Sequence, residues 1–149
     1  MTIKQGDIYL VNLGPPRLSE PGFRHPHVVV QNNVFNASRI HTVVVCALTT
    51  NLKRAKAPGT VILNKGEAHL KKKSVVNISQ IFTVNKCDLI EKIGQLSENR
   101  ICEILDGIKL LTEPREPVTS QKVRVPMGIG EEVFPESLMI RNGFWRSRG

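Results

Sequence analysis

The sequence contains no apolar run long enough to cross a membrane. Its longest apolar stretches, residues 28–30 and 43–48, have the length of single strands, whereas a membrane-spanning helix needs about 20 apolar residues. Residues 1–7 also lack the apolar block of a signal peptide. We therefore expect a cytoplasmic protein with no membrane partner.

Cysteine and aromatic residues are scarce as well. The three cysteines, Cys46, Cys87 and Cys102, are odd in number and lack paired spacing, so neither a disulfide framework nor a four-ligand zinc site is predicted. Because Cys46 lies in a valine-rich run and Cys102 in a helical pattern, we expect both to pack as small apolar residues. Only five Phe, one Tyr and one Trp are present, which argues against a broad platform that stacks on single-stranded bases.

Acidic residues are outnumbered by basic ones. With 21 Lys and Arg against 13 Asp and Glu, the formal net charge is +8 and the pI is about 9.8. The positive charge clusters at residues 53–56 and 71–73. Such a balance fits an anionic partner, with nucleic acid as the foremost candidate. Taken alone, the charge runs fit a merely solvated surface equally well.

Five short apolar runs, separated by stretches that contain Gly, Pro and Asn, recur along residues 7–84. In the run at residues 42–48, apolar and polar residues do not alternate, which predicts a central strand covered on both faces. Beyond Ser97, apolar residues recur at helical spacing up to Leu111, which predicts a helix of about four turns that ends before Pro114. The predicted strands span residues 7–13, 27–31, 42–48, 60–63 and 74–84.

These elements predict one mainly β domain over residues 1–113. Its expected architecture is a small antiparallel curled sheet, or barrel, closed against a C-terminal helix. Residues 113–117 include two prolines and indicate a boundary or linker. Residues 114–149 form a tail in which we find no clear period.

Gln80 is an exception within the fifth predicted strand. Strict alternation places it on one face with Val76, Ile78, Phe82 and Val84. An amide in such an apolar row either satisfies a buried backbone group or lines a binding site. Both interpretations stay open at the level of the sequence.

A long segment without an apolar period separates the first two strands. Residues 14–27 contain the carboxylate of Glu20, the guanidinium of Arg24, and the imidazoles of His25 and His27. Connections of this length in compact domains are usually functional or disordered. The reactive side chains gathered here favour a functional loop.

Four segments stand in an order and spacing that are specific as a set: Gly6-Asp7-Ile8-Tyr9, then Ser19-Glu20 with a basic residue and proline before Val28-Val29-Val30, then Cys46-Ala47-Leu48-Thr49-Thr50, then Val76-Asn77-Ile78-Ser79-Gln80-Ile81. Together they resemble the MazF/PemK family of toxin endoribonucleases, over residues 3–113. The resemblance implies an SH3-like barrel of the CcdB/PemK type, usually a homodimer, with a cognate antitoxin of the MazE/PemI type. It also implies sequence-specific cleavage of single-stranded RNA, as an mRNA interferase, by attack of the 2′-hydroxyl and without a metal or other cofactor.

The resemblance also implies catalytic roles, with one departure. The family usually has arginine directly before the proline of the second segment, whereas an ungapped comparison puts His25 there and Arg24 one residue earlier. Arg24 is our first candidate for the cation that stabilises the phosphoryl oxygens, because arginine stays charged and its planar fork fits phosphate. Thr49 matches the family's catalytic threonine, whose hydroxyl contacts the scissile phosphate. His25 can serve as general acid or base.

Further polar side chains are candidates for contacts to the substrate. Glu20 is expected to orient Arg24, to act as a base, or only to solubilise the loop. The cations of residues 53–56 follow Thr49 and would hold the RNA backbone, a contact that carries little sequence information. The candidate binding residues are Glu20, Thr50, Gln80, Lys53, Arg54 and Lys56.

Two other interpretations stay open. His25 and His27 are spaced to share a strand face as metal ligands, although no carboxylate or cysteine accompanies them at ligand spacing. A barrel of this type that does not cleave, such as a decayed copy, would bind nucleic acid, DNA gyrase or antitoxin. The displaced arginine and the tail at residues 114–149 favour this second class.

Overall fold

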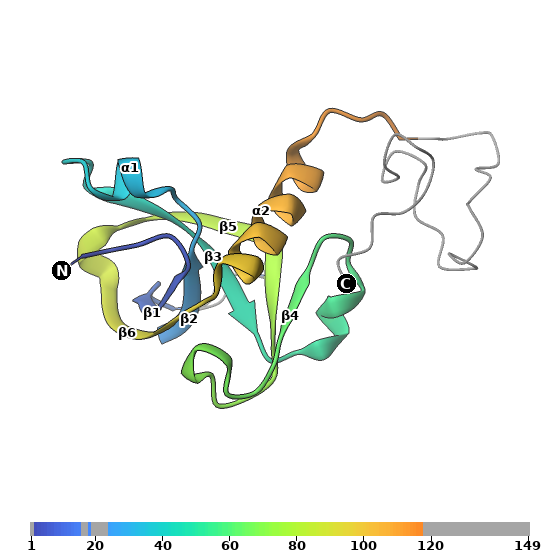
Figure 1. The fold of residues 1–149 in the computed structure, drawn as a ribbon, viewed down its shortest axis with the longest axis horizontal. Helices are drawn as coiled ribbons and strands as arrows, with labels where there is room; N and C mark the ends of the chain where they lie inside the picture. Colours follow the sequence, from blue (N-terminus) through green and yellow to red (C-terminus); the bar gives the residue numbers. More distant parts are fainter. Residues whose placement is uncertain (1, 16–17, 19–23, 118–149) are drawn as a thin grey trace. The chain divides into compact units, whose positions relative to one another are not determined.

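Six strands form one curled antiparallel sheet in the order β4-β5-β3-β2-β1-β6, and one long helix packs across it (Figure 1). The computed structural model describes residues 2–15, 18 and 24–117. The chain divides into two units, Met1–Leu111 and Thr112–Gly149. The fold described here is that of the first unit, and the domain boundary expected at residue 113 stays a prediction.

The secondary structure is mainly β, and it ends in a helix, as the sequence predicts. The helices are α1 (Asn33–Asn36) and α2 (Glu98–Thr112). Within the described residues, none of the helices is both long and apolar enough to cross a membrane. The short 3-10 helices are η1 (Leu52–Lys56), η2 (Glu67–His69) and η3 (Lys86–Asp88). The strands are β1 (Asp7–Asn12), β2 (Arg24–Val29), β3 (Thr42–Thr49), β4 (Val61–Leu63), β5 (Ser74–Asn85) and β6 (Leu89–Gln95).

Two apolar clusters cover the two faces of the sheet. The first cluster lies between the sheet and α2, and the second lies on the opposite face. Because β3 supplies side chains to both, the predicted central strand is confirmed. The first cluster includes Ile8, Val28, Cys46, Leu48 and Ile104. The second includes Tyr9, Val11, Val29, Val43 and Val45.

The two main differences between the observed and the predicted strands concern β6 and β2. β6 was not predicted, because as an edge strand paired with β1 alone it keeps mostly exposed, polar side chains. β2 begins at Arg24 rather than at residue 27, so it contains Pro26. The register between β2 and β3 starts at His27, so the missing N–H of Pro26 interrupts no rung of that ladder.

The predicted single apolar face of β5 is wrong. The register between β3 and β5 steps from Ala47↔Asn77 to Cys46↔Ile81, which leaves residues 78–80 outside the regular ladder. After this irregularity the side chains of β5 change faces. Ile78 belongs to the first cluster, whereas Phe82 packs against the second.

The cysteines also divide between core and surface. Cys46 is fully buried, donates its Sγ–H to the Asn77 carbonyl oxygen at 3.1 Å, and has its pKa raised by burial to about 12. Cys102 is exposed on α2, so the expectation that it packs as an apolar residue is wrong. The buried stripe of α2 passes through Ile104 and Gly107 instead.

Candidate functional site

The ends of β2 and β3 bring His25 and Thr49 to the same level of the sheet. The two strands pair antiparallel with His27 opposite Ala47, and the same register continued by two residues sets His25 opposite Thr49. Burial lowers the pKa of His25, against a smaller rise from its hydrogen bond with the Leu48 backbone. That bond also ties the imidazole to the end of β3.

Strand alternation assigns His25 and Arg24 to different faces. Val29 and Val45 belong to the second cluster, so residues at alternate positions, His25 on β2 and Thr49 on β3, share that face. Arg24 is the first residue of β2, is exposed, and pairs with Asn12 of β1. The fold therefore groups the imidazole with the candidate hydroxyl and sets the guanidinium one strand position away.

His27 lies behind His25 as a fully buried imidazole. Its Nδ1 is 2.9 Å from the His25 carbonyl oxygen, so Nδ1 carries the proton and donates. Burial lowers the pKa of His27 to about 4, and among the described residues its Nε2 has no hydrogen-bond partner. The ring meets those of His25 and Phe82 edge-on, with centroids 5.7 Å and 5.6 Å away.

An amide network continues this polar face onto β5. Asn77 pairs with Ala47 and is buried, with 4% of its surface exposed. Its Nδ2 donates to Gln80 Oε1 at 3.0 Å, and its Oδ1 accepts from Ser79 Oγ at 2.9 Å. Gln80 thus contacts the Asn77 side chain, and both of its interpretations from the sequence, a bond to a buried backbone group and a place in the binding site, stay predictions. Sequence reasoning did not identify Asn77, although a lone Asn between valine and isoleucine was a visible signal.

Thr49 is half-buried at the last position of β3. Its Oγ1 accepts the backbone N–H of Asn51 at 3.1 Å, which orients the side chain and leaves its hydroxyl hydrogen available to a phosphoryl oxygen. Thr50, the neighbouring candidate for binding the substrate, is exposed just beyond the strand. The local bond and a contact to substrate are compatible, because they use different parts of the hydroxyl.

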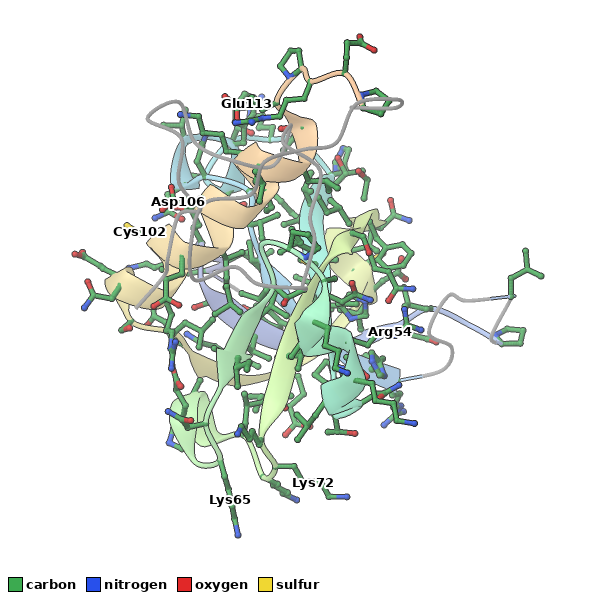
Figure 2. All side chains as sticks on the ribbon, turned by 90° about the vertical axis from the view of Figure 1, so that its right-hand side faces the viewer. Arg54, Lys65, Lys72, Cys102, Asp106 and Glu113 are labelled. Carbon is green, nitrogen blue, oxygen red and sulfur yellow. The ribbon has the colours of Figure 1, made fainter. Side chains whose placement is uncertain are left out.

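Three cations follow directly after this strand end. The Asn51 side chain accepts the Lys53 N–H at 3.2 Å and starts η1. The side chains of Lys53, Arg54 and Lys56 are all exposed on this short helix, and Figure 2 shows Arg54 at the surface. Glu20, the remaining candidate, lies outside the described residues. The expected guanidinium–carboxylate contact with Arg24 therefore stays a prediction.

The site has few groups that could hold a metal ion. Within the part of the chain that the structure describes, no cluster of three or more His, Cys, Asp or Glu side chains has a suitable arrangement. His25 and His27 share a face, but His27 is fully buried and uses Nδ1 on a carbonyl oxygen. Such a pair is a poor chelate.

Comparison with known proteins identifies relatives over most of the chain. Residues 4–112 match the family described as PemK-like, MazF-like toxin of type II toxin-antitoxin system. The chain is 38% identical to endoribonuclease MazF2 of Mycobacterium bovis over 109 residues, which are 73% of this chain and 96% of the relative. It is 39% identical to endoribonuclease MazF of Staphylococcus epidermidis, covering 72% and 89% of the two chains. A mycobacterial endoribonuclease solved in complex with its cognate antitoxin has the same fold, with a TM-score of 0.62, 23% identity, and coverage of 76% and 99%.

Proposed function

This chain belongs to the PemK-like, MazF-like toxin family of type II toxin–antitoxin systems, and from that membership we propose that it is an endoribonuclease that cleaves single-stranded RNA. The observation that supports the catalytic part is the register of β2 and β3, which, continued by two residues beyond His27↔Ala47, sets His25 opposite Thr49 on the face of the second cluster. Relatives that this chain matches over most of their own length are endoribonucleases. In the cell the target would be mRNA, and its cleavage would arrest translation.

The proposed reaction needs three groups. Neutral His25 takes the proton from the 2′-hydroxyl, and the 2′-oxygen forms a bond to phosphorus. The Thr49 hydroxyl stabilises the phosphoryl oxygens as negative charge develops on them. The charge of Arg24 would add to this from the exposed first position of β2, where its long side chain would have to reach around the strand end to the face of His25. The bond from phosphorus to the 5′-oxygen then breaks, and the imidazolium returns its proton to that oxygen. The products are a 2′,3′-cyclic phosphate and a 5′-hydroxyl, and the proposed reaction uses no cofactor.

We further propose a homodimer that an antitoxin inhibits. A structural relative has been solved in complex with its cognate antitoxin, and the family comprises the toxins of such pairs. The antitoxin would compete with RNA for the surface around β2, β3 and η1. The cations Lys53, Arg54 and Lys56, with Thr50 and Gln80 nearby, would contact the RNA in its absence.

Cleavage of an unstructured RNA tests the catalytic proposal. We expect His25→Ala and Arg24→Ala each to reduce the rate of formation of new 5′-hydroxyl ends by at least ~10²-fold, the effect of losing a general base or a phosphoryl donor. Thr49→Val should reduce the rate as well, since it removes the hydroxyl and keeps the shape. Far-ultraviolet circular dichroism checks that each variant is folded.

His41→Ala is the matched control, because it removes an exposed imidazole at the opposite end of β3. It should cleave RNA at the parental rate. If His25→Ala and His41→Ala cleave equally well, His25 has no catalytic role. The same outcome for Arg24→Ala would remove the guanidinium from the mechanism.

The second candidate function is binding without cleavage, and the imidazole in place of the family's arginine favours it. In that case the parental protein would bind RNA with an affinity that falls steeply as salt rises, yet no new 5′-hydroxyl ends would appear. Rescue of cleavage by His25→Arg would then show that the departure at this position had inactivated the site.

A further inference from the structure

A second group of cations lies on the loop between β4 and β5, and the proposed catalytic site does not use it. This basic tip comprises residues 64–73, and its four lysines are all exposed. Figure 2 shows Lys65 and Lys72 extending into solvent at the same end of the molecule. The lysines of the basic tip are Lys65, Lys71, Lys72 and Lys73.

The basic tip contains one acidic residue, Glu67, whose carboxylate is paired within the protein. Glu67 accepts the Asn64 N–H at 3.0 Å. Its two carboxylate oxygens also pair with Arg100 of α2, at 2.7 Å to Nε and 3.2 Å to Nη2. The carboxylate is therefore engaged by the protein, and the outer surface of the basic tip presents positive charge.

The backbone of the basic tip is held in an unusual conformation. Ala68 and His69 have φ values of 49° and 63°, a left-handed region that residues other than glycine rarely adopt. Such conformations persist only where surrounding contacts enforce them, and they gather at functional sites. Here Leu70 is buried in the first cluster, and the Ala68 backbone packs directly on Gly94 of β6, where a Cβ would have no room. These contacts therefore hold the backbone of the segment that carries the lysines in one conformation.

The basic tip connects directly to the candidate active site. Lys73 is followed by Ser74, the first residue of β5, and the next residue, Val75, pairs with Thr49. On the other side of Thr49, the chain continues into the cations of η1. The strand end that bears the candidate hydroxyl thus continues into the cations of η1 and pairs with the strand that begins directly after the basic tip.

We propose that the basic tip is a second RNA-binding surface, which holds the phosphodiester backbone outside the linkage that is cut. The inference rests on the proposed endoribonuclease function. Lysines with no exposed apolar neighbour in the segment suit phosphate contacts, which position a nucleic acid. A protein partner would instead be expected to meet aromatic or apolar side chains at the centre of the contact, and within residues 64–73 the one large aliphatic residue, Leu70, is buried.

The test compares Lys71→Gln/Lys72→Gln with a matched control, Lys4→Gln/Arg39→Gln. Both double variants remove two exposed cations, and the control positions precede β1 and β3, at the ends of the sheet away from Thr49. The RNAs are a long unstructured strand and a short oligonucleotide that carries only the cut sequence, mapped first with the parental protein. Binding is measured with a 2′-deoxy nucleotide at the cut position, which removes the attacking hydroxyl.

For the long RNA, we expect the basic-tip variant to bind more weakly. The slope of the logarithm of the binding constant against the logarithm of the salt concentration should become shallower by about 0.7 for each phosphate contact removed. Its kcat and its cleavage of the short RNA should stay at parental values, and the control should match the parent throughout. Equal slopes for the two double variants would overturn the proposal. So would an equal loss on short and long RNA, or a loss of antitoxin binding alone. A parental protein that produces no 5′-hydroxyl ends would instead contradict the proposed function itself.

Discussion

A neutral imidazole at position 25 gives the candidate site a chemistry that a guanidinium lacks. Because burial lowers the pKa of His25, its ring is largely unprotonated near pH 7 and can accept a proton. An arginine in the same place could only supply charge. The neighbouring Arg24, on the alternate strand position, would keep the cation and leave acid–base work to the histidine.

His27 makes the stability of the protein depend on pH. Its pKa is lowered by burial from 6.5 to about 4, so the unfolded chain takes up a proton first as the pH falls. Burial of the neutral His27 ring therefore makes its full contribution to the free energy of unfolding above pH 6.5. This contribution declines between pH 6.5 and 4, with a total loss of about 3 kcal/mol. Urea unfolding at a series of pH values measures it.

The matching variants are His27→Phe, which retains a ring but not the titration, and His41→Ala, which removes an exposed histidine. We expect His27→Phe to flatten the decline between pH 6.5 and 4, and His41→Ala to leave it unchanged. An unaltered decline in His27→Phe would mean that another group is responsible.

Among the elements, α2 makes a close backbone contact at a glycine with the loop between η1 and β4. Gly107 lies on the buried side of α2 and faces the backbone of Gly59, which follows η1. A Cβ at position 107 would collide with the Gly59 carbonyl oxygen. Because both contacting groups are backbone, no side chain can rotate away to make room.

Gly107→Ala tests this contact, since two effects of opposite sign compete there. Alanine is favoured over glycine inside a helix by about 1 kcal/mol, whereas overpacking costs about 1–3 kcal/mol. We expect the overpacking to prevail and the free energy of unfolding to fall in a urea titration. Cys102→Ala, at an exposed position of the same helix, should change it little. A more stable Gly107→Ala protein would contradict the close approach.

At the scale of the whole molecule, the proposed homodimer predicts a mass twice that of one chain, which is 16.6 kDa. Exposed apolar side chains gather around α1, where Val34 and Phe35 are 79% and 51% exposed and Ile40 is 42% exposed. Patches of this kind are typical of protein contacts. Light scattering at several concentrations measures the mass, and a single-chain mass at every concentration would exclude the dimer.

The sequence predicts most of this fold because its apolar runs are buried in the way their patterns indicate. The unbroken run ending at Leu48 gives the central strand, and the stripe through Ile104 gives α2. β6 was not predicted, because an exposed edge strand has few buried apolar residues that would mark it in the sequence. That His25 lies level with Thr49 could not be predicted either, since it follows from continuing the register between β2 and β3 by two residues and from a strand that starts before Pro26.

The irregularity at residues 78–80 of β5 has a consequence for insertions and deletions. Upstream of it the strand supplies one layer of the core through Val76, and downstream it supplies the other through Phe82 and Val84. Adding or removing a single residue there would invert the second half, exposing Phe82 to water and turning Thr83 inward. Length variation among homologous toxins should therefore avoid this stretch, however freely their loops differ.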